Sequence, residues 1–154
     1  MVQHKMRVAY VSGPYRAPTI RQVVQNIRAA EEIAVQLWQF GFAVICPHTN
    51  TQLFDGIFES DCKTLNPADK TNGQNFINGD IEMLNRLIPD YDLIVMVPRY
   101  LESEGARQEL KGAIERGLLV RYWTPGEGRL KSLKELGKDS ITVNVTTVYN
   151  VRTE

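Results

Sequence analysis

Apolar side chains follow a helical repeat over residues 19–40 of the sequence. They recur at steps of three and four residues, at Ile20, Val23, Val24, Ile27, Ala30, Ile33, Ala34, Leu37 and Trp38. Because these steps match the period of about 3.6 residues per turn, they predict one amphipathic helix, with these positions on its apolar face and Gly41 as its stop. Two further helices are expected over residues 76–88 and 104–117, ended by Pro89 and Gly117.

Short runs rich in Val, Ile and Leu lie between these helices and predict strands. The runs cover residues 6–12, 42–46, 91–97 and 118–123. The third run is apolar without a break, which is typical of a strand buried on both faces of its sheet. Strands that alternate with helices predict a doubly wound α/β fold of Rossmann or flavodoxin type, with a mostly parallel sheet and helices on both faces.

Two segments fit this alternation less well. Residues 47–78 are rich in Asn, Asp, Thr and Gly, and are expected to form a covering segment of functional importance with one helical turn within it. After a short expected helix at 130–136, residues 141–148 alternate apolar and polar side chains as a half-exposed edge strand does. Such an edge pairs with another subunit or needs protection, which favours a homo-oligomer, a dimer or higher.

The composition narrows the possible partners. A chain of 154 residues without repeats or linkers predicts a single domain, 1–154, and its 18 basic and 18 acidic residues cancel, which argues against nucleic acid or an anionic membrane as partner. The two cysteines, Cys46 and Cys62, have no metal-ligand spacing, and His4 and His48 stand alone, so neither a metal site nor a cofactor is predicted. With no signal peptide and no long apolar run, the expected location is cytoplasmic.

Polar residues follow three of the predicted strands, where ligands bind in open α/β sheets. The candidates for substrate contact or catalysis at this edge are Tyr10, Ser12, Gly13, Tyr15, Arg16, His48, Asn50, Ser103, Gly105 and Glu109. Asp80 is expected near the start of the second helix, on the approach to the third strand. Asp80 and Glu109 can form a pair in which one carboxylate attacks or activates and the other orients or donates a proton.

Each of these residues also has a purely structural interpretation. Glu109 fits an early helical position favoured by the helix dipole, and Ser103 fits a helix N-cap. Tyr10 on a central strand is by default a core aromatic residue. Tyr15 and Arg16 fit turn positions after Gly13-Pro14, and a lone loop histidine such as His48 is more often structural than functional.

An ordered set of motifs resembles a known family. The set consists of Tyr10-Val-Ser-Gly-Pro-Tyr15, Asn78-Gly-Asp80, Asp92-Leu-Ile-Val and Ser103-x-Gly-Ala-x-x-Glu109. It is similar to the nucleoside 2-deoxyribosyltransferase-like superfamily, and within it to small uncharacterised bacterial and phage members, over roughly residues 7–122. The resemblance implies a doubly wound sheet, cleavage of the N-glycosidic bond of a nucleoside or nucleotide, and self-association in which neighbouring subunits complete the pocket.

The resemblance also implies roles for single residues. Glu109 matches the nucleophile that attacks the anomeric carbon and forms a glycosyl-enzyme intermediate. Tyr10 matches the tyrosine that orients this glutamate, and Asp80 the aspartate that protonates the leaving base. Ser103 stands where the transferases carry an aspartate and the nucleotide hydrolases a serine that contacts the 5'-phosphate. This difference favours a 5'-phosphorylated substrate or hydrolysis.

Further expectations follow from the chemistry of these residue types. A carboxylate near a helix N-terminus should be held ionised, so we expect Glu109 to be ready to attack, whereas Asp80 needs burial to raise its pKa. Backbone amides after Gly105, the Ser103 hydroxyl and Arg16 are expected to hold a phosphate, and His48 to line the base pocket. A non-catalytic nucleotide-binding or sensing module and an NAD glycohydrolase-like enzyme stay open as alternatives, as do the base, the sugar and the choice between hydrolysis and transfer.

Overall fold

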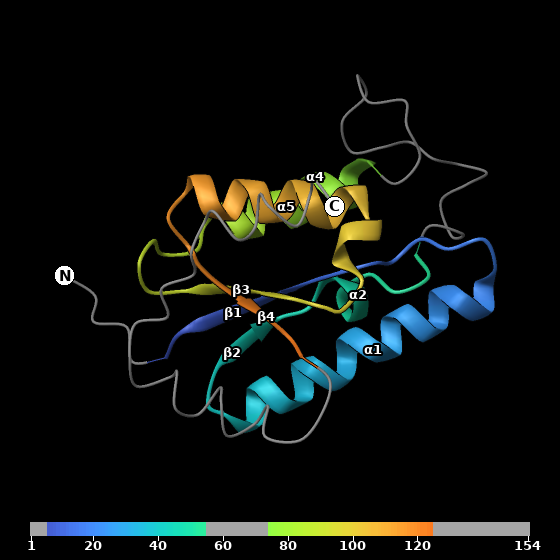
Figure 1. The fold of residues 1–154 in the computed structure, drawn as a ribbon, viewed down its shortest axis with the longest axis horizontal. Helices are drawn as coiled ribbons and strands as arrows, with labels where there is room; N and C mark the ends of the chain where they lie inside the picture. The colour runs from blue at the N-terminus through green and yellow to red at the C-terminus, as the bar shows by residue number, and fades with distance from the viewer. Residues whose placement is uncertain (1–5, 55–73, 125–154) are drawn as a thin grey trace.

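A computed structural model describes residues 6–54 and 74–124 of the chain, which contain a four-stranded parallel sheet (Figure 1). The strands are β1 (Val8–Ser12), β2 (Ala43–Ile45), β3 (Leu93–Met96) and β4 (Leu119–Tyr122), in the spatial order β2-β1-β3-β4. All three neighbouring pairs run parallel. The predicted α/β fold of Rossmann or flavodoxin type is confirmed, and β3 is buried at every position as its sequence indicated.

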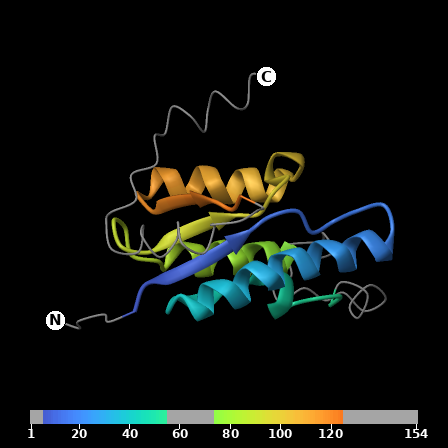
Figure 2. The same cartoon turned by 60° about the horizontal axis from the view of Figure 1, so that its bottom comes forward.

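Helices cover both faces of this sheet. Helix α1 (Ile20–Gln39) packs on one face, while α4 (Gln74–Asn85) and α5 (Glu104–Glu115) lie side by side on the other (Figures 1 and 2). Along β1, the side chains of Ala9 and Val11 pack under α1, and that of Tyr10 packs under α4 and α5. A short helix α2 (Pro47–Asn50) and a 3-10 helix η1 (Tyr100–Glu102) complete the described elements.

The helix ends follow local chemistry. The Thr19 side chain caps α1 by accepting a hydrogen bond from the Gln22 amide at 3.2 Å. Gly41 and Gly117, the predicted stops, have φ angles of 90° and 77°, in the left-handed region that glycine adopts at little cost. The predicted helical turn within residues 47–78 is α2, with Pro47 in its first turn.

The helix predicted over residues 19–40 is confirmed as α1, but three of its apolar side chains are exposed, and the expected position of Asp80 was wrong. Ile20, Val24 and Trp38 are exposed by 77%, 36% and 54%, because they lie beyond the edge of the α1 face that contacts the sheet. Asp80 is the seventh of the twelve residues of α4 (Gln74–Asn85), so it lies in the middle of this helix and not near its start. The expected elements at 130–136 and 141–148 lie outside the described residues.

The strand order places the ligand edge of the sheet. The chain leaves β1 toward β2 on one side and later crosses to β3 on the other, so the order reverses between β1 and β3. In such sheets, ligands bind outside the carboxyl ends of the two strands at the reversal. Here Val97 donates a backbone hydrogen bond to the Ser12 carbonyl at 2.8 Å. A Cβ on Gly13 would overlap the Val97 side chain, so the close approach of these two segments requires glycine at position 13.

Asp92 joins the strands at the opposite edge. Its side chain is buried, and its two carboxylate oxygens accept hydrogen bonds from the backbone amides of Val8 at 2.8 Å and Ile88 at 2.7 Å. Although Asp92 belongs to the motif set, its contacts serve the fold.

Candidate functional site

Three separate elements bring Tyr10, Asp80 and Glu109 together. Tyr10 comes from β1 and is completely buried under α4 and α5. Asp80 comes from the middle of α4, and Glu109 is the sixth residue of α5. The two carboxylates lie close enough to the Tyr10 phenol that both act on its charge state. The strand order predicts a ligand outside the carboxyl ends of β1 and β3, and Tyr10 lies two residues before the carboxyl end of β1.

Three buried polar atoms meet in this arrangement. The hydroxyls of Tyr10 and Ser12 and the Oε2 atom of Glu109 are shielded from solvent and make no hydrogen bond of standard geometry within the described part of the chain. Nevertheless, both hydroxyls are near enough to the carboxylate to stabilise its negative charge. Hydrogen bonds of this kind are often long in a protein without substrate and shorten when the substrate binds.

Burial dominates the charge state of Glu109. It raises the pKa of Glu109 to about 7. The Tyr10 hydroxyl lowers this pKa, and so does the Ser12 hydroxyl, whereas the nearby Asp80 carboxylate raises it further. The expectation that the helix N-terminus would hold Glu109 ionised was wrong. The helix dipole acts within about the first turn, and Glu109 lies beyond it, with its Oε2 atom shielded from solvent.

The pKa values of Asp80 and Tyr10 are also raised. Burial raises the pKa of Asp80 to about 6, which is the direction that proton donation requires. Burial, followed by the Glu109 and Asp80 carboxylates, raises the pKa of Tyr10 far above its usual range. The phenol therefore keeps its proton and acts as a donor.

Ser103 is the N-cap of α5. Its Oγ accepts a hydrogen bond from the Ala106 amide at 3.2 Å, so the structural interpretation of this serine is confirmed. Its own proton is still available to a ligand. Gly105 is exposed, and a Cβ there would meet nothing nearer than the Ser103 Oγ, at 3.9 Å. Because Gly105 precedes Glu109 by four residues, it lies one turn away on the same helix face and leaves the approach to Glu109 open.

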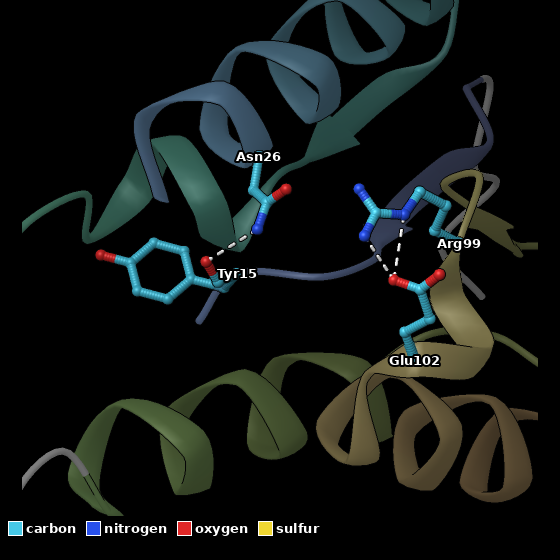
Figure 3. Close-up of polar contacts among 4 residues, drawn as sticks. All are labelled: Tyr15, Asn26, Arg99 and Glu102. Atoms are coloured by element: carbon cyan, nitrogen blue, oxygen red, sulfur yellow. Dashed lines mark hydrogen bonds and ion pairs between the residues drawn. The ribbon is translucent and has the colours of Figure 1, made fainter. Parts of the chain in front are cut away.

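Tyr15 holds the loop after β1 in place. Asn26 of α1 donates a hydrogen bond to the Tyr15 carbonyl at 3.1 Å, as Figure 3 shows. The Tyr15 hydroxyl accepts a hydrogen bond from the Leu53 amide at 2.9 Å, and Leu53 has a φ of 60°, which is uncommon for leucine. Tyr15 therefore connects α1 to the segment that follows α2.

His48 is buried against the same loop. Its Nε2 lies 2.8 Å from the Pro14 carbonyl, which can only accept, so Nε2 carries a proton. Burial lowers the pKa of His48, which favours a neutral ring with Nδ1 as a bare acceptor. Its ring also packs edge to face with Tyr15 at 5.8 Å between centroids. These contacts support a structural role, and Arg16, next in the loop, is exposed.

Arg99 is a positive charge that the sequence analysis did not single out. It follows β3 with a φ of 69°, and its Nε donates to the Glu102 carboxylate at 2.9 Å (Figure 3). The pair lies just before the N-terminus of α5 and is exposed, so it contributes little to stability. The sequence signal was only its place in the loop after the third strand.

A pair of phenylalanines beside Asp80 was also missed. Phe76 lies one turn before Asp80 on the α4 face that also buries Leu84, and the buried Leu87 follows the end of the helix. Phe54 packs edge to face against Phe76, at 6.2 Å between centroids, and is 38% exposed. The helical spacing of Phe76, Asp80, Leu84 and Leu87 was the available signal. The apolar face of α4 thus continues past the core to the candidate acid.

The comparisons with known proteins add no family to these observations. No protein-family model matches the chain, and no curated protein is significantly similar to it. Within residues 6–54 and 74–124, no three His, Cys, Asp or Glu side chains gather in a group that suits a metal ion. In the same part of the chain, no helix is long and apolar enough to cross a membrane.

The raised pKa of Glu109 predicts a change in stability with pH. Because the folded protein holds this proton up to about pH 7 and the unfolded chain releases it near pH 4.5, the free energy of unfolding should fall as pH rises between these values. Glu109→Gln removes that loss, so the variant should be more stable than the parent by about 1–3 kcal/mol at pH 8. At pH 4.5 the difference should vanish.

Urea denaturation at the two pH values measures this effect. Glu104→Gln, in the first turn of the same helix and exposed, is the matched control and should change stability by no more than about 0.5 kcal/mol at either pH. A Glu109→Gln protein that is less stable than the parent at pH 8 would show that Glu109 is ionised and stabilised in the fold.

Proposed function

We propose that this protein cleaves the N-glycosidic bond of a nucleoside or nucleoside 5'-monophosphate, as a member of the nucleoside 2-deoxyribosyltransferase-like superfamily. One observation carries the proposal. The Oε2 atom of the Glu109 carboxylate is shielded from solvent, and this carboxylate lies near the Tyr10 phenol from β1 and the Asp80 carboxylate from α4. Keeping such a group buried is costly, and groups of this kind concentrate at catalytic sites.

The proposed first step uses both carboxylates. An oxygen of ionised Glu109 forms a bond to the anomeric carbon while the carbon–nitrogen bond breaks. The electron pair of that bond passes to the base nitrogen, and the base takes the proton of Asp80. The pKa values of the two acids, about 7 for Glu109 and about 6 for Asp80, lie close together, so one shared proton moves between them at little cost.

The second step releases the sugar. In hydrolysis, water attacks the anomeric carbon, gives a proton to the Asp80 carboxylate and frees Glu109. In transfer, the nitrogen of a second base takes the place of water. Tyr10 stays protonated throughout and orients Glu109 as a hydrogen-bond donor.

The surroundings support an aromatic leaving group and an anionic sugar substituent. Phe76, one turn before Asp80, packs against the exposed ring of Phe54, and the two provide an aromatic surface on which a flat base could stack. On the other side, the first amides of α5, with the Ser103 hydroxyl, form a site at which a phosphate is favoured. The exposed guanidinium of Arg99 lies nearby in sequence and adds positive charge.

We also propose a homo-oligomer in the cytoplasm. Four apolar side chains of α1 are exposed, and a second copy of the chain would cover them: Ile20, Val24, Val35 and Trp38. Cys46 is a free, buried thiol, which fits a reducing compartment. Light scattering on the purified protein measures the assembly, and a clean monomer would remove this part of the proposal.

A product screen tests the activity. The protein is incubated with nucleosides and their 5'-monophosphates, with and without a second base, and free base is measured by chromatography. We expect base release that Glu109→Ala lowers by about 10³-fold or more, because the nucleophile is lost. A fully active Glu109→Ala protein would exclude the mechanism. Release of nicotinamide from NAD alone would select the glycohydrolase, and thermal stabilisation by nucleotides without product would select the binding module.

Two helical glycines test the approach to Glu109. A Cβ at Gly105 would make only an ordinary contact with the Ser103 Oγ, at 3.9 Å, and a Cβ at Gly112 would meet nothing within 4 Å. Alanine at either position should therefore keep the fold and stabilise α5 by about 0.5–1 kcal/mol. Gly105→Ala adds a methyl group one turn before Glu109 on the same helix face, on the proposed path of the substrate, and should lower kcat/KM about tenfold or more. Gly112→Ala, which lies on the far side of Glu109 along the helix, should leave kcat/KM unchanged. Equal activity of the two variants would show that the substrate does not approach over Gly105.

A further inference from the structure

The two serines at the ligand edge differ in how their hydroxyls are used. The Ser103 oxygen already accepts a hydrogen bond from the first turn of α5. The Ser12 side chain is buried, with the residue only 1% exposed, and its hydroxyl makes no hydrogen bond of standard geometry within the described residues. A buried hydroxyl without a partner costs about 1–3 kcal/mol. The Ser12 hydroxyl therefore needs an acceptor, and the hydrogen bonds of the sheet do not provide one.

The backbone holds Ser12 rigidly. Ser12 is the last residue of β1, and its carbonyl accepts the Val97 amide at 2.8 Å. The next residue, Gly13, packs directly against the Val97 side chain. Ser12 follows Tyr10 by two residues along the strand, so both side chains point to the same face of the sheet, under α5.

The acceptor on that face is Glu109. Its Oε2 atom is buried and lacks a hydrogen bond of standard geometry, as does the hydroxyl of Ser12. One of these atoms needs a donor, and the other has a proton to donate. The groups that act on Glu109 come from two elements: Tyr10 and Ser12 from β1, and Asp80 from α4.

We propose that the Ser12 hydroxyl is a second positioning donor for the Glu109 carboxylate, beside Tyr10. A carboxylate held by one donor can still rotate about its terminal bond, whereas two donors on a rigid strand define its plane. The remaining lone pairs then point in a defined direction. This role replaces the expectation that Ser12 contacts the substrate. The effect of Ser12 on catalysis rests on the proposed function, but the proposed hydrogen bond from Ser12 to Glu109 does not.

The contact predicts the direction of a pKa change. A donor to the ionised carboxylate lowers its pKa, so Ser12→Ala should raise the pKa of Glu109 above the value of about 7 in the parent. Selective ¹³C labelling of glutamate and NMR titration of the free protein measure this value, with Glu109→Gln used to assign the signal. The measurement needs no substrate, so its result stands whether or not the glycosidase proposal holds.

Two further variants serve as controls for the titration. Ser12→Thr keeps the hydroxyl and should keep the pKa of Glu109 near that of the parent. Ser103→Ala removes a hydroxyl from the start of α5 and should lower the melting temperature through loss of the cap, without moving the pKa of Glu109. A pKa of Glu109 that is the same in Ser12→Ala and in the parent overturns the proposal.

Kinetics on an active substrate separate positioning from substrate contact. Ser12→Ala should lower kcat about tenfold, leave KM within about twofold, and move the acidic limb of the pH profile to higher pH, because fewer molecules hold Glu109 ionised. An unchanged kcat with a raised KM would assign Ser12 to the substrate and also overturn the proposal.

Discussion

The arrangement of the sheet depends on one buried carboxylate, that of Asp92. Its oxygens receive the amides of Val8, where β1 begins, and of Ile88, after α4. Its own amide donates to the Ile88 carbonyl at 2.9 Å, and its carbonyl accepts from Leu119, at the start of β4, at 3.1 Å. One residue thus joins three strands and the end of a helix. All of these bonds lie at the amino edge of the sheet, opposite the carboxyl ends of β1 and β3.

The sequence predicted the elements well where the signal was local. The unbroken apolar run of β3 and the two stop glycines, Gly41 and Gly117, depend on neighbours in sequence, and each was found as expected. The periodicity of α1 could not show how much of the helix the sheet covers, so the exposure of Trp38 was missed. The position of Asp80 within α4 was missed because the apolar pattern first showed at Phe76, whereas the helix already includes Gln74.

Some features of the candidate site could likewise be predicted from the sequence, and others could not. The ordered motifs, through the family that they resemble, pointed to Tyr10, Asp80 and Glu109, which the structure brings near one another. The capping role of Ser103 followed from its place before a helix. The charge state of Glu109 was not predictable, because it depends on water being excluded by elements distant in sequence. The pairing of Phe54 with Phe76 likewise joins two segments whose contact no local pattern records.

The burial of Glu109 has a consequence for how the chain changes over generations. A glutamate codon becomes a glutamine codon by a single base change, and glutamine has nearly the same shape without a charge to bury. Most random substitutions reduce stability, whereas this one would relieve a cost that the fold now carries. A lineage with no use for the carboxylate would therefore tend to lose it by drift.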